Sequence, residues 1–507
     1  MCNIQSQKMG IIVKQTIKSS IFAYIGIVLG FTTTAFLMPK ALNQAQVGLV
    51  RLLVSIMVVL SQAANLGFNT AGSRLFPYFR NEKNKHNGYF FWACAVSLVG
   101  LFITLGTFAI NYDWLLNFLN VKASPLLKDY LYWIFPLTIF GVYFLVFDNY
   151  QRVLFDTVSG TFLKEFAQRV FLFIAVIIYL FNFVTFSGFV AFYCIGLCLP
   201  TLFMLLQIIL KGNFSLKIVN GFWTKKLKIE FASLSFLTFL SGFSSQIVNY
   251  LDQIQVTSII NLDANGIYAT MLMFGTVIYM PTTMVARIGS TIIAEAWKNQ
   301  DMKIIKEVYD KSCLNLLIVG SLLFLCVVLN LHNIFEILPT YKTGYWVVIW
   351  IAIGKLFDMA TGLNGLILQT SKYYFYDILF MILLIVGTWF LNQIFIPIYG
   401  ITGSAVATTV MIFLFNFFRT IFVWKAFGFW PFTLKNLYTI LILIFVFALV
   451  FFVPKLSAIN FLPGFIIDTL MRSVLAIGLY CIIVYFANIS SDFNQIINQL
   501  LKKLSLN

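Results

Sequence analysis

One apolar stretch near the start of the chain, residues 47–67, carries polar side chains at regular intervals. At about 100° per residue along a helix, these positions fall within an arc of roughly 80°. They are Arg51, Ser55, Gln62, Asn65 and, just beyond the stretch, Asn69. A guanidinium can bind an anionic group, and amides and hydroxyls can bind sugar hydroxyls. Because a charge inside a bilayer costs about 3 kcal/mol even on the mildest scale, we expect this stripe to face protein or water and not lipid.

Arg51 alone has a simpler explanation. It lies close to the end of its stretch, and a long basic side chain in that position can extend its head group to the membrane interface. That explanation leaves the aligned amides and the hydroxyl unaccounted for, so a stripe that lines a cavity remains the better hypothesis.

A second charged group lies in the stretch of residues 345–368. Lys355 shares a helix face with Asp358, Gly362 and Gln369, within an arc of about 60°. Lys355 and Asp358 can satisfy each other as a pair at i,i+3, or the lysine can bind a ligand. The sequence leaves both open, and the two are compatible if the pair opens during a functional cycle.

A third polar stripe lies in the stretch of residues 231–260, where Ser241, Ser245, Asn249 and Asp252 fall within about 80°. An ionisable residue inside a membrane span is a functional candidate by default. The alternative for Asp252 is that it neutralises Arg51 or Lys355. Near the C-terminus, Asp468 and Arg472 are spaced i,i+4 and predict a local ion pair.

Composition sets the class of protein. The 507 residues are 60% hydrophobic and 10% charged, against about 25% charged residues in soluble domains. We therefore predict an all-α polytopic membrane protein. The net charge of +16 comes from basic residues dispersed among short loops, which favours the positive-inside rule over nucleic-acid binding. Their distribution predicts that both termini are cytoplasmic.

Catalytic chemistry finds no support in the sequence. The seven cysteines and two histidines lack metal-ligand spacing, so no metal site is expected. A phosphate-binding glycine–lysine loop is missing, and no nucleophile–base pair falls in a plausible shared site. We expect no catalytic residue and no bound cofactor.

The twenty-residue criterion for a membrane span gives about fourteen transmembrane helices. A weak internal repeat divides them, because Gly48 follows Leu42-Asn43 as Gly266 follows Leu262-Asp263. Glycine after a loop is also common in membrane hairpins, so the repeat has that alternative explanation. Pro281, in the eighth span, predicts a kink that can serve as a hinge. The predicted architecture has two pseudo-symmetric six-helix lobes plus two C-terminal helices. The predicted boundaries are an N-terminal lobe (residues 1–210), a basic cytoplasmic linker (211–230), a C-terminal lobe (231–430), and two additional helices with a cytoplasmic tail (431–507).

Three short segments carry a resemblance to a known family. They are Gly48-Leu49-Val50-Arg51 with Leu66-Gly67-Phe68-Asn69, the tail from Arg74 through Phe76-Pro77-Tyr78-Phe79 to Arg80, and Tyr399-Gly400-Ile401 with Gly403-Ser404-Ala405. With the helix count and loop plan, they resemble the polysaccharide-transport or O-antigen flippase family. That family belongs to the multidrug/oligosaccharidyl-lipid/polysaccharide exporter superfamily.

The resemblance implies a flippase that moves undecaprenyl-diphosphate-linked oligosaccharide across the bacterial inner membrane by alternating access. The cargo would be an O-antigen, capsule or exopolysaccharide unit, and the partners would be membrane lipids and other polysaccharide-assembly proteins. In this scheme the substrate-binding residues are Arg51, Gln62, Asn65, Asn69 and Lys355. By resemblance to cation-coupled relatives, Na⁺ or H⁺ coupling would involve Asn249, Asp252, Asp358 and Asp377.

Two other functions stay open. A cation-coupled multidrug antiporter would have the same fold, because a fold does not dictate cargo. The first apolar helix has no Asp or Glu, unlike many multidrug exporters of this superfamily. A membrane glycosyltransferase or polysaccharide polymerase would need acids, arginines or a large loop at the external face, where this sequence has little.

Overall fold

The computed structural model describes residues 22–219, 221–455 and 464–504. Every regular element in these ranges is a helix. Twelve helices are long and apolar enough to cross a membrane, or thirteen when a bent pair counts as one span. A further helical run, residues 158–180, carries three charged residues, Lys164, Glu165 and Arg169. That run is not among the candidate spans, so the described ranges hold twelve or thirteen spans against the fourteen predicted. The prediction of an all-α polytopic membrane protein is confirmed.

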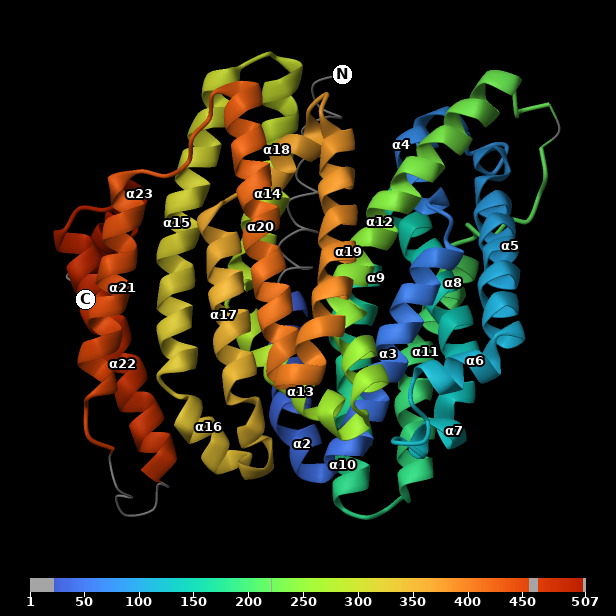
Figure 1. The fold of residues 1–507 in the computed structure, drawn as a ribbon. Coiled ribbons are helices and arrows are strands. Elements are labelled where there is room, and N and C mark those ends of the chain that lie inside the picture. The colour runs from blue at the N-terminus through green and yellow to red at the C-terminus, as the bar shows by residue number, and fades with distance from the viewer. Residues whose placement is uncertain (1–21, 220, 456–463, 505–507) are drawn as a thin grey trace. The chain divides into compact units, whose positions relative to one another are not determined.

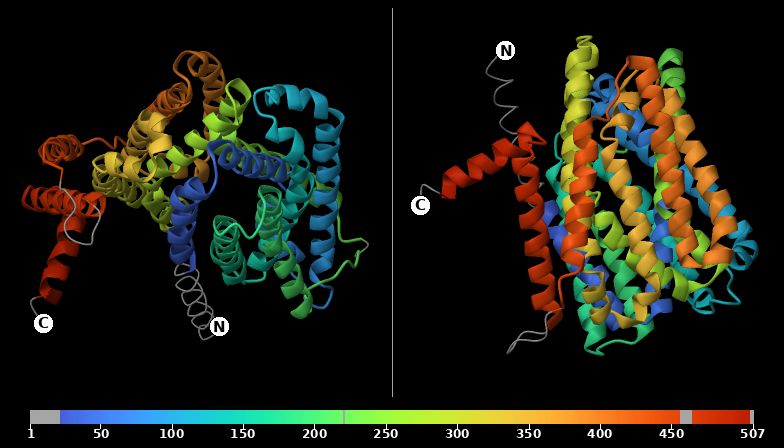
Figure 2. Two further views of the ribbon diagram at one scale, coloured as in Figure 1. Left: turned by 90° about the horizontal axis from the view of Figure 1, so that it is seen from below. Right: turned by 60° about the vertical axis from the view of Figure 1, so that its left-hand side comes forward.

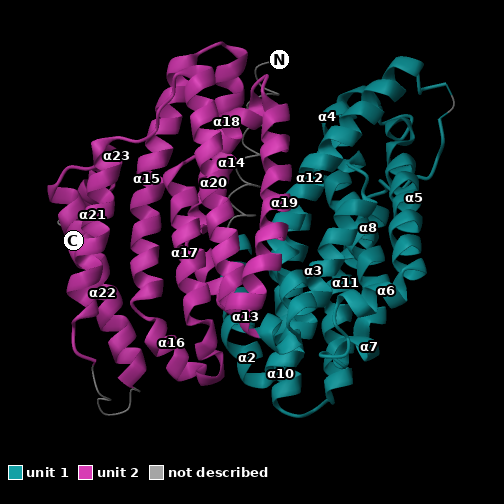
Figure 3. Ribbon diagram, in the orientation of Figure 1, with its two compact units in different colours: residues 1–266 teal, residues 267–507 magenta. Residues whose placement is uncertain are grey.

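The chain divides into two compact units, residues 1–266 and 267–507 (Figure 3). The long helix after the basic linker belongs to the first unit, and the boundary falls inside the next helix. The lobe boundaries inferred from the repeat remain a prediction.

The helices of the first unit follow one another along the chain, with the basic linker between α11 and α12 (Figure 1). They are the first helix Phe22–Ala41, which contains the π-helix η1 (Thr33–Leu37) and ends in α2 (Met38–Ala41), then α3 (Gln44–Ala64), α4 (Phe68–Phe79), η2 (His86–Gly88), α5 (Tyr89–Ile110), α6 (Tyr112–Phe118), α7 (Leu126–Tyr130), η3 (Leu131–Trp133), α8 (Ile134–Val153), α9 (Val158–Thr161), the π-helix η4 (Phe162–Ala167), α10 (Gln168–Leu180), α11 (Phe186–Leu210) and α12 (Lys225–Ile259).

Helix α3 is the centre of the first unit. It starts at a capping box in which Asn43 accepts from the Gln46 amide and Gln46 bonds back to the Asn43 amide, which satisfies two helix-end donors at once. From there α3 packs against α5, α8 and α12. Its apolar face is buried, with Leu49 and Leu52 fully enclosed, so the polar positions on the same helix are held at fixed places inside the unit.

A loop contact in the first unit gives a pH-dependent prediction. Asp156 accepts hydrogen bonds from the Ser159 amide (3.1 Å) and hydroxyl (2.6 Å), and forms an ion pair with Lys211. Partial burial opposes ionisation of this carboxyl, but the bonds from Lys211 and Ser159 outweigh it, so its pKa lies below the usual range. Because the pKa of Asp156 is lower in the folded state, its ionised form stabilises the fold. This contribution to the free energy of unfolding is fully present above the unfolded pKa of about 3.9 and is lost as the pH falls through the folded pKa.

Asp156→Asn is therefore expected to lower the free energy of unfolding at neutral pH by up to about 1 kcal/mol, because a partly exposed ion pair contributes little more. Its deficit relative to wild type should vanish in acid, below the folded pKa of Asp156. Thermal unfolding in detergent at both pH values measures the effect. Asp113→Asn, an exposed carboxylate on α6, is the matched control, and an acid-insensitive deficit of Asp156→Asn would contradict the prediction.

The second unit begins within a bent pair and ends in two peripheral helices and a short amphipathic one (Figures 1 and 2). Its elements are α13 (Leu262–Val277), which starts in the first unit, then α14 (Met280–Lys298), α15 (Met302–Val328), α16 (Leu331–Ile337), η5 (Pro339–Gly344), α17 (Tyr345–Ala360), α18 (Asn364–Thr370), α19 (Tyr374–Tyr399), α20 (Ile401–Phe427), α21 (Leu434–Phe451), α22 (Gly464–Phe486) and α23 (Ser491–Leu504).

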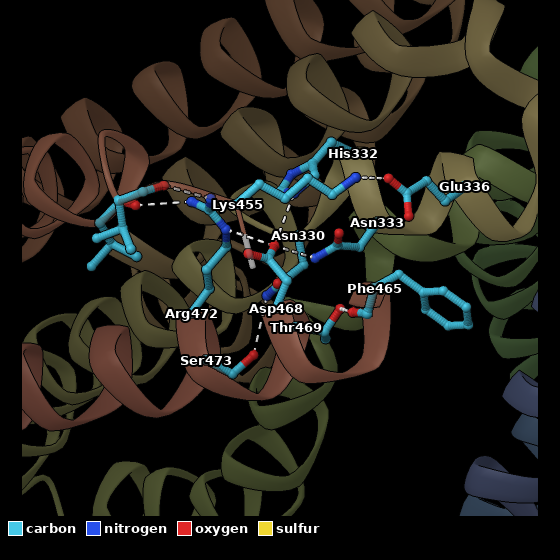
Figure 4. Close-up of polar contacts among 12 residues, drawn as sticks. Asn330, His332, Asn333, Glu336, Lys455, Phe465, Asp468, Thr469, Arg472 and Ser473 are labelled. Atoms are coloured by element: carbon cyan, nitrogen blue, oxygen red, sulfur yellow. Dashed lines mark hydrogen bonds and ion pairs between the residues drawn. The ribbon is translucent and has the colours of Figure 1, made fainter. Parts of the chain in front are cut away.

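Two features of the second unit bear on predictions from the sequence. Helices α13 and α14 meet at an angle of 54°, and Pro281 lies in the first turn of α14, where its missing N–H costs nothing. The kink expected at Pro281 is thus present as a break between two helices. The predicted ion pair between Asp468 and Arg472 is confirmed, with Arg472 Nε 2.8 Å from Asp468 Oδ2 (Figure 4).

Candidate functional site

The polar stripe of α3 faces protein, as predicted. Ser55 is fully buried and donates to Gln253 Oε1 on α12 at 3.1 Å. Arg51 is half-buried, and its charge lies close enough to the hydroxyls of Tyr193 and Tyr250 to interact with both. The side chain is thus directed at other helices of its own unit.

Asn65 and Asn69 lie at a break in this membrane helix. Leu66 and Gly67 both have positive φ, 50° and 72°, and they separate α3 from α4. Gly67 is required there, because a Cβ would lie 2.1 Å from the Ser235 carbonyl oxygen on α12. The side-chain oxygens of Asn65 and Asn69 are buried without a hydrogen-bond partner. Unsatisfied buried amides are rare and point to a ligand, a water or a strained site.

Gln62 lines a cavity of about 120 Å³ inside the first unit. The cavity is enclosed by α3, α8, η4, α10, α11 and α12. Its polar lining residues are Ser61, Gln62, Lys164, Gln168, Thr201 and Gln246. The stripe on α3 therefore contributes one of three glutamines that meet here.

Lys164 is the functional candidate that the sequence analysis missed. It lies in π-helix η4, within the helical run that begins at Val158 and ends at Leu180. Its ammonium lies 5.4 Å from the centre of the Phe144 ring, a cation–π distance. The sequence did contain a sign of this role. Glu165 and Arg169 are spaced i,i+4 and neutralise each other, which leaves the adjacent Lys164 without an acidic partner on its own helix.

The expected ion-coupling residues fall into two sets. Asn249 and Asp252 lie on α12 in the first unit, where Asn249 is exposed and Asp252 is 5% exposed. Asp358 and Asp377 lie in the second unit.

In the second unit, Lys355 and Asp358 do not pair with each other. The Lys355 ammonium lies 4.9 Å from the centre of the Tyr279 ring. Asp358 accepts from Asn416 Nδ2 at 2.9 Å and is hydrogen-bonded with the hydroxyl of Tyr279. Of the two possibilities left open by the sequence, the i,i+3 ion pair is not formed among the described residues, and Lys355 is held by an aromatic face.

Around Asp358, side-chain oxygens converge at the end of α17. The Thr361 hydroxyl and Asn364 Nδ2 both donate to Asn416 Oδ1, at 3.0 Å and 3.2 Å. Gly362, with φ of 60°, turns the chain between α17 and α18. Carboxylate, amide and hydroxyl oxygens are the donors that hard cations prefer, so this cluster offers the chemistry of a cation site. No group of three or more His, Cys, Asp or Glu suited to a metal occurs in the described ranges.

Asp377 has a different environment from Asp358. It forms a buried ion pair with Arg419, and it accepts from Gln369 Nε2 at 3.1 Å. The guanidinium of Arg419 also stacks on Phe415, 3.9 Å from the ring centre. A carboxylate already neutralised by arginine is a poor cation ligand, which favours a structural role for Asp377. Arg419 was not selected from the sequence, because its partner lies on another helix.

The repeat glycines Gly48 and Gly266 pack against each other at the start of α3 and α13. A Cβ on Gly48 would lie 1.9 Å from the Leu262 carbonyl oxygen, and one on Gly266 would lie 2.0 Å from that of Gln44. Asn265, fully buried, donates to the Gly48 carbonyl oxygen at 3.0 Å. Small residues allow such close helix crossings in membranes.

Gly48→Ala is expected to destabilise the protein by about 1–3 kcal/mol, because the added methyl group forces two backbones apart. The midpoint of thermal unfolding in detergent measures the effect. Gly106→Ala on α5, where a Cβ would have no neighbour within 4 Å, is the control and should be neutral or slightly stabilising. Equal midpoints for the two variants would contradict the close crossing.

Comparison with known proteins identifies the fold. No protein-family model and no curated protein sequence matches the chain. Among solved structures, the lipid II flippase MurJ in an inward closed conformation is similar, with a TM-score of 0.69, 14% identity, and coverage of 93% of this chain and 99% of that one.

Two structures of multidrug resistance transporters of the MATE family, within the MOP superfamily, are also similar. An inward-facing conformation has a TM-score of 0.57, 11% identity, and coverage of 80% of this chain and 94% of that one. An outward-facing conformation has a TM-score of 0.54, 11% identity, and coverage of 82% and 95% of the two chains. The protein is thus a multi-pass membrane protein that shares its fold with a lipid II flippase and with MATE transporters of the MOP superfamily.

Proposed function

We propose that the protein is a flippase that translocates undecaprenyl-diphosphate-linked oligosaccharide across the bacterial inner membrane by alternating access. The observation that carries this proposal is the environment of two lysines that lie within helical runs. Lys164 and Lys355 each lie against an aromatic ring, and neither forms an ion pair with an acidic residue in the described ranges. A cation without a carboxylate partner is suited to an anionic cargo.

The cargo combines a diphosphate, a sugar chain and an apolar tail. In this proposal Arg51 in the first unit and Lys355 in the second are substrate-binding cations, and the amides of Gln62, Asn65 and Asn69 bind sugar hydroxyls. The buried side-chain oxygens of Asn65 and Asn69, which lack partners, support such a role, because a ligand hydroxyl would satisfy them.

Coupling to Na⁺ or H⁺ is proposed for Asp358 with its oxygen-rich neighbours, and for Asn249 and Asp252 in the first unit. Pro281 is proposed as the hinge, which the 54° break beside it supports. Asp377 is proposed as a further ion-coupling residue, and its ion pair with Arg419 would open when the cation binds.

The proposed location is the bacterial inner membrane, with membrane lipids and other polysaccharide-assembly proteins as partners. Both chain termini are proposed to be cytoplasmic. The terminal residues 1–21 and 505–507 lie outside the described ranges.

A cation-coupled multidrug antiporter is the second candidate, and the likeness to MATE structures favours it. The lining of the cavity in the first unit argues against it, because that lining holds a lysine and no acidic residue. A cationic drug would be repelled there. A membrane glycosyltransferase or polymerase has no specific observation in its favour.

A deletion strain tests the proposal. Loss of the protein should reduce the surface polysaccharide and trap lipid-linked precursor on the cytoplasmic leaflet. A changed drug resistance with normal glycan export would favour the antiporter. Glycan transfer by the purified protein would favour the enzyme.

A further inference from the structure

The cavity of the first unit has one charged group in its lining, and that group is a cation. Lys164 is the only Lys, Arg, Asp or Glu among the residues that line it. The nearby acid, Glu165, pairs instead with Arg169, whose Nη2 lies 2.7 Å from Glu165 Oε2. Lys164 forms no ion pair in the described ranges and its side chain is exposed, so its positive charge is accessible to a ligand in the cavity.

The local backbone explains why Lys164 and Glu165 are used differently. Both lie in the π-helix η4, and π-turns within membrane helices are frequent at functional sites because they redirect side chains. The first helix packs directly on this turn, since a Cβ on Gly26 would lie 1.7 Å from the Glu165 carbonyl oxygen. Arg169 also donates to the Gly26 carbonyl oxygen at 3.1 Å. The pair thus fixes the turn, while Lys164 reaches the cavity.

The amides in the lining are available to a ligand. The side chains of Gln62 and Gln246 make no hydrogen bond to any residue that the structure describes. Gln168 donates to the Leu197 carbonyl oxygen at 3.2 Å, which leaves its own oxygen as an acceptor. An amide offers both donors and acceptors, so these side chains can bind hydroxyl groups while the ammonium binds anionic oxygens.

The size of the cavity suits one small polar unit. One ordered water needs roughly 10–15 Å³ of comparable volume, so about 120 Å³ has room for about eight waters or more. That space is enough for a single sugar ring with a charged substituent, or for a diphosphate, and the cavity is partly open, so the rest of a longer cargo can extend out of it.

We propose that this cavity is a binding subsite for an anionic, oxygen-rich group of the cargo, with Lys164 as its charge-recognising residue and Gln62, Gln168 and Gln246 as its hydrogen-bonding residues. The inference rests on the proposed flippase function. The anionic oxygens can belong to an acidic sugar of uronate type or to the diphosphate linkage, and the two sources share this chemistry.

Binding to the full-length protein in nanodiscs tests the subsite. The probes are D-glucuronate, inorganic pyrophosphate and, as a neutral sugar, D-glucose, each titrated by calorimetry and by the shift of the thermal midpoint. Lys164→Gln should weaken binding of the anionic probe about tenfold, as expected for one charge-assisted contact, and should leave D-glucose binding unchanged. Gln246→Ala should weaken binding of D-glucuronate and of D-glucose, while the protein still binds D-glucuronate more tightly than D-glucose. Lys128→Gln, an exposed lysine on α7, is the matched control.

The outcomes distinguish an acidic sugar from the diphosphate as the source of the anionic oxygens, and they distinguish failure of the subsite from failure of the flippase proposal. Lys164-dependent binding of D-glucuronate supports an acidic sugar, and Lys164-dependent binding of pyrophosphate alone supports the diphosphate. If neither anion binds to wild type, or if a folded Lys164→Gln binds it as wild type does, the subsite is overturned. Trapped lipid-linked precursor in the deletion strain would leave the flippase proposal standing in that case. Anion binding without any trapped precursor would overturn the flippase and keep the subsite.

Discussion

Arg51→Ala and Lys355→Ala are each expected to abolish most glycan export while the protein still inserts into the membrane. Each variant removes one of the proposed substrate-binding cations, and a hydrogen bond to a charged group contributes about 1.5–3 kcal/mol. That energy corresponds to a loss of roughly 10- to 100-fold in transport rate if the contact is made during translocation. Surface polysaccharide and trapped lipid-linked precursor are the measurements.

Conservative variants sharpen this test. Arg51→Lys keeps the charge but loses the planar fork that binds two phosphate oxygens, so we expect intermediate export. Lys355→Arg keeps a cation that can still stack on Tyr279 and should be the milder of the two. Arg74→Ala, an exposed arginine on α4, is the control. Normal export in both alanine variants would remove Arg51 and Lys355 from the site.

Asp468→Ala is expected to lower the free energy of unfolding by about 3–5 kcal/mol, the cost of leaving a buried partner charge uncompensated. Asp468 is fully buried, and its Oδ2 accepts from Arg472 Nε at 2.8 Å and from Asn333 Nδ2 at 2.8 Å (Figure 4). His332 Nε2 lies 3.0 Å from the same oxygen. One substitution therefore removes a partner from three side chains.

The effect should extend to helix α21, because Arg472 also donates to the carbonyl oxygens of Val450 (3.0 Å) and Val453 (2.7 Å) at its C-terminal end. The midpoint of thermal unfolding in detergent measures the loss. Thr469→Ala is the control on the next residue, whose hydroxyl bonds only within its own helix, to the Phe465 carbonyl oxygen. Midpoints of Asp468→Ala and Thr469→Ala that coincide would show that the cluster contributes nothing to stability.

The class of protein and several local features follow from the sequence alone. A composition of 60% hydrophobic residues in runs of about twenty leaves membrane-spanning helices as the solution, because backbone polar groups must be satisfied within the lipid. The same periodicity placed Ser55 and Gln62 on one protein-facing side of α3, and the i,i+4 spacing identified the Asp468–Arg472 pair. These predictions hold because they depend on neighbours within a single helix.

Tertiary structure decided which charged groups have partners. Asp377 pairs with Arg419, 42 residues away, and Lys355 lies on Tyr279 instead of pairing with Asp358. The close crossing of Gly48 and Gly266 and the position of Lys164 in a cavity lining likewise could not be predicted from the sequence. Each depends on which helix faces lie side by side, and where most positions of the helices are apolar, the sequence pattern does not encode that choice.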